Sequence, residues 1–224
     1  VAPFELLETH SNFCVYESAV AMPTYQAGEP PFSTEGGRIA FVDEVPQRVG
    51  EEQARFFVTV PRTAMPSGGY PVVLFSRTGG GGDRPLIDRG VRDATGVPVE
   101  EGSGPAREFA DVGWAGASID GPHGGIRNPG GSDEQLLIFN FTNPPAMLDN
   151  IRQSALELVL AAHLRDDVNF DATGCEGSGV EAARFDTTEL TLMGHSMGAT
   201  IAPLALAVEP KFRGAILSGA GGSW

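Results

Sequence analysis

Short apolar segments with the composition of buried strands alternate with helix-like segments along most of the chain, and this alternation limits the fold more than any other feature. The strand-like segments are residues 70–76, 113–120, 190–193 and 212–219. Helix-like patterns lie just before residue 113, over 143–167 and over 197–208. Because parallel strands must be joined by crossover connections, we predict an α/β fold whose mostly parallel sheet has helices on both faces.

Two further strand-like segments lie earlier in the chain. Arg38–Val45 and Ala54–Pro61 are rich in β-branched and aromatic residues, and a glycine-containing connection joins them. Such a connection suits an antiparallel pair, so we predict that these two strands open the sheet. Residues 1–37 precede them as an N-terminal arm.

Residues 143–167 carry the strongest helix signal in the chain. Asn143 is a candidate N-cap, and the prolines after it stand where the first turn of a helix tolerates them. The predicted apolar face consists of Met147, Leu148, Ile151, Ala155, Leu158 and Ala162. We therefore predict a long helix that covers one face of the sheet.

The composition excludes several classes of function. Of the 224 residues, 41% are hydrophobic and 20% are charged, which is typical of a globular domain. The net charge of −14 and the presence of one lysine, Lys211, argue against nucleic-acid binding, which needs clustered basic side chains. No apolar run approaches the roughly 20 residues that a membrane helix requires. We expect a soluble chain without a transmembrane segment, and the residues at its start do not resemble a signal peptide.

The two cysteines, Cys14 and Cys175, stand far apart and show no metal-binding spacing. They are either a disulfide that ties the N-terminal arm to the segment before residues 190–193, or two free thiols. We favour the disulfide because the chain is acidic, glycine-rich and poor in lysine, and with it a secreted or periplasmic location. The acidic residues around Cys175 match no EF-hand spacing, so we predict no metal site there.

Ser196 lies in the sequence GHSMG, which fits the pattern G-x-S-x-G. In a glycine-rich chain this pattern arises easily by chance, but here an apolar strand precedes it and an apolar helix comes after it. A sharp turn between strand and helix would expose the serine, and Gly194 and Gly198 would leave room for that turn. The alternative is a serine that only caps the helix. We predict that Ser196 is a nucleophile.

Four stretches together resemble the α/β-hydrolase-fold serine hydrolases, in particular bacterial esterases, lipases and acetylhydrolase-like members. They are LMGHSMG, GGYPVVLFS with the glycine-rich loop after it, GWAGASIDGPHGG, and FNFTNPPAMLDNIRQSALEL. The resemblance implies that residues 38–224 are the N-terminal portion of one such domain, through about its sixth strand. It also implies a carboxylic ester hydrolase that forms an acyl-enzyme on Ser196 and needs no cofactor.

The resemblance also suggests which groups would stabilise the oxyanion. The backbone N–H of Met197, directly after the serine, would supply one donor. The second donor would come from the loop after residues 70–76, where many members have a His-Gly pair and this chain has SRTGGGG. Thr78, Gly79 and Gly80 all remain candidates for that donor, and Arg77 is a candidate for the pocket wall.

The acid and the histidine that would act with Ser196 are not where the resemblance predicts them. Members of this superfamily place an acid and then a histidine after the serine, whereas this chain has only Glu209 and no histidine there. His123 and His195 are better explained as pocket-wall or loop residues than as the base. We therefore expect the acid and histidine on a second polypeptide or on a C-terminal continuation. A serine peptidase, a thioesterase and a non-catalytic binding protein of the same fold remain alternatives.

Overall fold

The computed structural model describes residues 1–221 except 96, 98, 165, 167 and 180, so residues 222–224 of the predicted domain lie outside the described part. Its sheets contain β1 (Glu5–Thr9), β2 (Phe13–Thr24), β3 (Gln26–Ala27), β4 (Arg38–Ile39), β5 (Phe41–Val42), β6 (Val45–Pro46), β7 (Gly50–Pro61), β8 (Tyr70–Ser76), β9 (Ala115–Ile119), β10 (Asn169–Asp171), β11 (Ala182–His195) and β12 (Gly214–Ser218). Its helices are α1 (Pro85–Asp88), α2 (Pro105–Asp111), η1 (Gly125–Arg127), α3 (Glu134–Phe139), α4 (Pro144–Leu164) and α5 (Met197–Val208).

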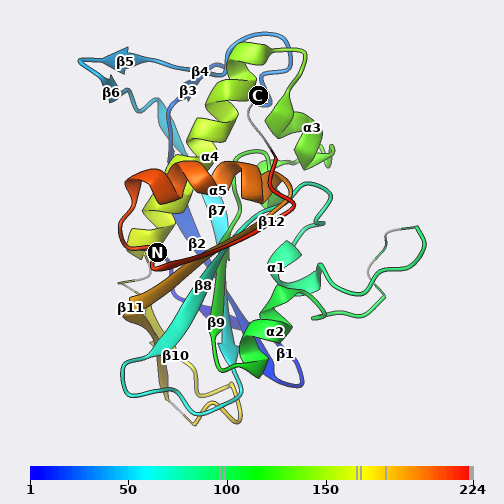
Figure 1. Ribbon diagram of the computed structural model, residues 1–224, viewed down its shortest axis with the longest axis vertical. Coiled ribbons are helices and arrows are strands. Elements are labelled where there is room, and N and C mark those ends of the chain that lie inside the picture. Colours follow the sequence, from blue (N-terminus) through cyan, green and yellow to red (C-terminus); the bar gives the residue numbers. More distant parts are fainter. Residues whose placement is uncertain (96, 98, 165, 167, 180, 222–224) are drawn as a thin grey trace.

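The central sheet has the order β1-β2-β7-β9-β8-β11-β10, and β12 also pairs with β11 (Figure 1). The strands β9, β8, β11 and β12 run parallel to one another, whereas β1, β2 and β7 form an antiparallel part. This mixed sheet with helices confirms the predicted α/β class. The carboxyl ends of the parallel strands meet at one edge, where α/β proteins place their sites.

Alternate residues of β8 point to opposite faces of the sheet, and each face has its own helices. Val72 and Leu74 belong to a core that also contains alanines of α4 and α5. Val73 and Phe75 belong to a second core with Leu86 of α1 and residues of α2. Because helices cover both faces, β8 is apolar throughout rather than alternating with polar residues.

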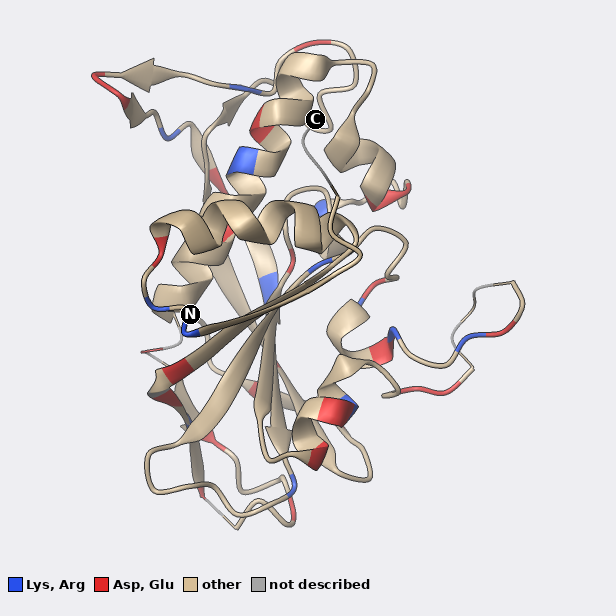
Figure 2. Ribbon diagram, in the orientation of Figure 1, with Lys and Arg blue, Asp and Glu red and all other residues tan. Residues whose placement is uncertain are grey.

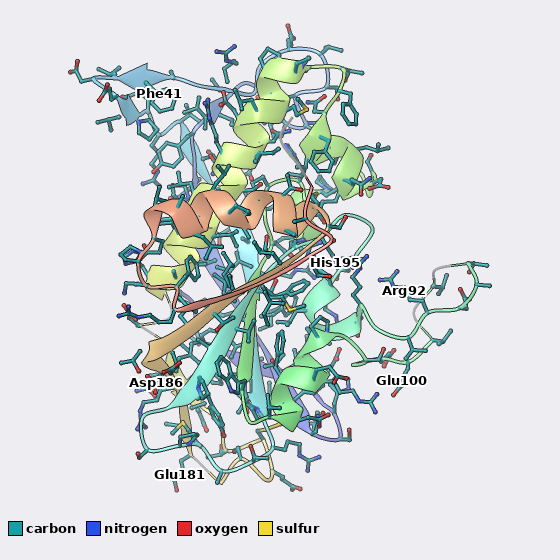
Figure 3. All side chains as sticks on the ribbon, in the orientation of Figure 1. Phe41, Arg92, Glu100, Glu181, Asp186 and His195 are labelled. Atoms are coloured by element: carbon teal, nitrogen blue, oxygen red, sulfur yellow. A yellow bond between two sulfur atoms is a disulfide. The ribbon has the colours of Figure 1, made fainter. Side chains whose placement is uncertain are left out.

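The predicted pairing at the start of the sheet is wrong. Ala54–Pro61 does lie in β7, but β7 pairs along its length with β2 and not with Arg38–Val45. The latter segment forms the short strands β4, β5 and β6, and Phe41 at its projecting hairpin is 52% exposed (Figure 3). Burial of β2 selects this pairing, because its first four residues are buried and alternate residues remain buried as far as Met22, whereas the 38–45 segment has no buried face of comparable length. Residues 1–37 consequently contribute two strands to the sheet rather than a separate arm.

The long predicted helix is present as α4, but its buried face differs from the prediction. Ala155 and Ala162 are buried as expected, whereas Leu148 is 50% exposed. The buried side chains include a polar row made of Asp149, Asn150, Gln153 and Glu157. These side chains bind backbone groups and side chains of other segments, which apolar periodicity cannot predict.

Cys14 of β2 and Cys175 form a disulfide, as predicted. The bond joins residues 161 positions apart and ties the antiparallel part of the sheet to the connection between β10 and β11. Lysine and arginine positions are scattered along the ribbon among more numerous aspartate and glutamate positions, in keeping with the net charge (Figure 2). None of the helices in the described part of the chain combines the length and apolar content of a bilayer span.

Candidate active site

Ser196 occupies a strained turn between β11 and α5. Its backbone has φ 52° and ψ −115°, a conformation that non-glycine residues rarely adopt. The N–H of Ser196 donates to the carbonyl of Ser218 at 2.8 Å, and the carbonyl of Ser196 accepts from the N–H of Thr200 at 3.1 Å. These bonds hold the serine between the carboxyl end of β12 and the first turn of α5.

The glycines of the GHSMG motif are required by close backbone packing. A Cβ atom at Gly198 would lie 2.7 Å from the carbonyl oxygens of Ser76 and Arg77, and one at Gly194 would lie 2.5 Å from the carbonyl oxygen of Gly198. The start of α5 therefore sits directly on the carboxyl end of β8. This contact brings the glycine-rich loop after β8 next to the serine turn.

A cavity of about 250 Å³ opens beside Ser196. Its walls come from the first turn of α5, from α3 with the segment after it, and from the residues after β12. Leu136 and Phe141 in this wall are 61% and 64% exposed, so the cavity has an apolar rim that is open to solvent. Helix α3, which was not predicted from the sequence, thus forms one side of the site. Asp133 was an available signal, since its carboxylate caps α3 by accepting from the N–H of Gln135.

The glycine-rich loop lies against α3. A Cβ atom at Gly79 would lie 2.6 Å from Cβ of Gln135, so only glycine permits this approach. Thr78 is fully buried, and its Oγ1 has no hydrogen-bond partner among the described residues. The loop closes in a turn in which the N–H of Gly81 donates to the carbonyl of Thr78 at 3.2 Å.

Arg77 is buried beneath this loop and holds it from the inside. Its guanidinium donates to the carbonyls of Gly82 and Asp83, to the carboxylate of Asp120 at 3.2 Å, and to that of Glu134 at 2.8 Å. Burial raises the pKa of Glu134, and the charge of Arg77 opposes that increase. Arg77 therefore joins the end of β8, the glycine-rich loop, the end of β9 and the first turn of α3. This network was not predicted, since the sequence indicates Arg77 only as a wall residue.

The four histidines all have other neighbours. His195 points its Nδ1 at Ser218 Oγ, at 3.2 Å, from the carboxyl end of β11 (Figure 3). Nε2 of His123 lies 3.4 Å from Oδ1 of Asn150. His163 pairs with Glu209 at 2.8 Å, and His10 pairs with Glu8. Within the described residues, no histidine is paired with Ser196.

Burial lowers the pKa of both His123 and His195 below the usual value, although the hydrogen bond with Asn150 partly opposes this at His123. His123 lies in the turn between β9 and η1 and faces a second cavity. The predicted pocket-wall residues are thus divided among different sites. Arg77 supports the loop beside the serine, His195 lies next to the serine turn, and His123 lies elsewhere.

The fold of this chain has counterparts among solved structures. A solved structure from Bacteroides fragilis, which is assigned as an acetyl xylan esterase, matches 96% of this chain with 10% identity and a TM-score of 0.50. The chain has the α/β-hydrolase fold. A CE15 glucuronoyl esterase from Teredinibacter turnerae matches 99% of the chain with 13% identity and a TM-score of 0.49.

Both solved structures are much longer than this chain. The chain covers 47% of the Bacteroides structure and 45% of the Teredinibacter structure, so it spans about half the length of these proteins. No protein-family model and no curated protein matches the chain. Identities this low show a shared fold, and they do not indicate which substrate this chain acts on.

Proposed function

We propose that this chain carries the nucleophile-bearing part of a serine-dependent carboxylic ester hydrolase. The observation that carries the proposal is the backbone of Ser196, which holds a non-glycine residue at positive φ between a parallel strand and a helix. Strained conformations persist where the surrounding structure overdetermines them, and they cluster at active sites. Here the strain presents a hydroxyl at the mouth of a cavity.

In this proposal Ser196 Oγ attacks the ester carbonyl carbon, and its proton passes to a base as the C–O bond to the alcohol breaks. The alcohol leaves with that proton, and water then hydrolyses the acyl-serine. The N–H of Met197 and the N–H groups of Thr78 and Gly79 are the proposed oxyanion donors. The contact between Gly198 and the end of β8 supports this assignment, because it brings the start of α5 next to the loop that follows β8.

We further propose that the acid and histidine come from outside these 224 residues, on a second polypeptide or a continuation packed beside β12. All four histidines of the chain have other neighbours. Ile216 and Leu217 of β12 are 46% and 40% exposed, whereas the parallel strands β8 and β9 of the same sheet are almost entirely buried. An additional strand beside β12 would cover this apolar edge.

The lining of the cavity favours a small-molecule or lipid-like ester. Leu136, Phe139 and Phe141 offer an apolar surface next to Ser196, which suits an acyl chain or a hydrophobic alcohol. The disulfide supports a secreted or periplasmic location. A peptidase or thioesterase would use the same serine turn, so the choice between them is an experimental one.

The test is labelling with a fluorophosphonate probe on the protein that contains these residues, together with whatever sequence accompanies them. We expect one labelled site, mapped by peptide mass spectrometry to Ser196 and absent in Ser196→Ala. Ser103→Ala is the matched control, since Ser103 is a half-buried serine outside the cavity beside Ser196 and its Oγ accepts from the N–H of Val91. Turnover of nitrophenyl esters but not of peptide amides or thioesters would support the proposal. Absence of Ser196 labelling in the complete protein would favour the non-catalytic alternative.

A further inference from the structure

A second cavity, of about 370 Å³, shares no lining residue with the cavity beside Ser196. It is lined by the end of β2, the start of β7, the loop through Phe32 and the turn that holds His123. Its volume falls in the range of small-molecule sites, about 300–1,000 Å³. Pro122 also lines a small space that Met197 and Ile201 of α5 line, so this space is the neighbour of the second cavity on that side.

His123 faces this cavity with an unpaired ring nitrogen. The side chain is almost completely buried, with 5% exposed, and burial lowers its pKa, so the ring is neutral near pH 7. Oδ1 of Asn150 already accepts from Nε2 of Gln26 at 2.8 Å and can only accept from His123, so Nε2 of His123 is its protonated nitrogen. The other nitrogen, Nδ1, is therefore an acceptor, and it has no partner among the described residues.

Two more acceptors line the same cavity. Gln26 uses its amide nitrogen on Gly37 and Asn150, which leaves its Oε1 available. Glu52 uses one carboxylate oxygen on Arg127 at 2.7 Å, which leaves the other. The hydroxyl of Thr24 adds a group that can donate or accept.

Both of the carboxylates that line this cavity already have an arginine partner. Glu51 is paired with Arg48, and Glu52 shares Arg127 with the buried Glu157. A cation would therefore find both of the carboxylates that line the cavity already paired, whereas neutral hydroxyl groups would find several acceptors. The ring of Phe32, which meets that of His123 edge-on at 5.7 Å, adds apolar surface suited to the C–H face of a ring.

We propose that this cavity binds a neutral polyhydroxylated molecule, a single sugar ring or cyclic polyol, whose hydroxyl groups donate to Nδ1 of His123, Oε1 of Gln26 and the free oxygen of Glu52. The site is separate from the serine and does not depend on ester hydrolysis. It adds a binding function to the fold rather than a step of the proposed reaction.

The test observes the ring nitrogens of His123 by two-dimensional ¹H–¹⁵N NMR during titration with myo-inositol and with methyl β-xylopyranoside. We expect a saturable shift of the His123 signals with one or both probes, while the other three histidines stay unchanged. Cyclohexanol, which has one hydroxyl, should give no saturable shift. If neither polyol shifts His123, or if cyclohexylamine binds instead, the proposal is wrong.

Two variants locate the binding. Thr24→Val removes one hydroxyl and should weaken the affinity about 2- to 10-fold, whereas Thr9→Val, the same change at an exposed position of β1, should leave it unchanged. Gly50→Leu places a side chain beside Thr24 Oγ1, which lies 3.3 Å from a Cβ at that position, and should abolish binding. Equal affinity in Thr24→Val, Gly50→Leu and wild type would overturn the site. Binding to Ser196→Ala should match wild type, which separates this result from that for the hydrolase.

Discussion

At the scale of single residues, the backbone of Ser196 is strained, and Gly194 and Gly198 leave room for the close backbone contacts on either side of it. A residue at such a backbone conformation costs about 1–3 kcal/mol, which the contacts around it must offset. Those contacts are between backbones: the start of α5 touches the carbonyls of Ser76 and Arg77. The serine turn is therefore a property of close packing as much as of its own sequence.

Gly198→Ala should disturb this packing, because its Cβ would lie 2.7 Å from two carbonyl oxygens that cannot move aside. We expect a loss of about 1–3 kcal/mol in the free energy of unfolding and slower labelling of Ser196, measured by urea unfolding and probe kinetics. Gly121→Ala is the matched control, since nothing lies within 4 Å of a Cβ there. Equal losses in the two variants would contradict the packing argument.

His123 should make stability depend on pH. Because burial lowers its pKa in the folded state, the unfolded chain binds more protons between that lowered pKa and the ordinary value of about 6.5. The free energy of unfolding should therefore have its full value above about pH 6.5 and should decrease as the pH falls below that value. His123→Asn keeps a residue type that tolerates the left-handed backbone at φ 59° and should show a shallower fall in denaturation series across this range. An identical slope in both proteins would refute this role.

At the scale of elements, one buried guanidinium joins four segments around the serine. Arg77 links the end of β8 to the glycine-rich loop, to Asp120 after β9 and to Glu134 at the start of α3. Neither α3, with six residues, nor a loop of glycines would hold one position by its own propensity. Their placement beside Ser196 therefore depends on this side chain.

Arg77→Met should leave the buried carboxylate of Glu134 without its arginine partner, while Asp120 keeps Arg55, and cost about 3–5 kcal/mol of stability. Arg77→Lys keeps the charge but cannot reproduce the forked contacts, so it should lose less stability and yet lower kcat more than it raises KM. Urea unfolding and ester kinetics measure these effects. Arg48→Lys is the control, because Arg48 and Glu51 form an exposed pair, and its effect should stay within about 1 kcal/mol. A normal kcat in Arg77→Lys would show that the network does not position the site.

At the scale of the whole molecule, the antiparallel and parallel parts of the sheet depend on contacts between distant segments. The pairing of β2 with β7 and the disulfide from Cys14 to Cys175 bring the start of the chain against the β10–β11 connection. Both features close long loops, which is entropically costly in the unfolded chain.

Reduction of the disulfide should lower the free energy of unfolding by about 2–5 kcal/mol, because the unfolded chain regains the freedom that the link removed. Urea unfolding with and without reductant measures the loss. The double variant Cys14→Ala/Cys175→Ala should be equally destabilised and insensitive to reductant, since the chain has no other cysteine. An unchanged unfolding midpoint on reduction would contradict the expectation.

The features that the sequence determined by itself are those set by neighbouring residues. The apolar run of β8, the helical period of α4 and the strand–turn–helix setting of Ser196 all arise from patterns a few residues long, and all are present. The pairing of the two cysteines was also correct, helped by the absence of any competing thiol.

Only the tertiary structure decided which distant segments meet. It paired β7 with β2 instead of with residues 38–45, buried the polar row of α4, and brought Arg77 together with Asp120 and Glu134. Each of these outcomes depends on whether a polar group or strand edge finds its partner in a segment far along the chain. Local patterns report propensity and burial, whereas such partnerships are selected by the free energy of the whole packed sheet.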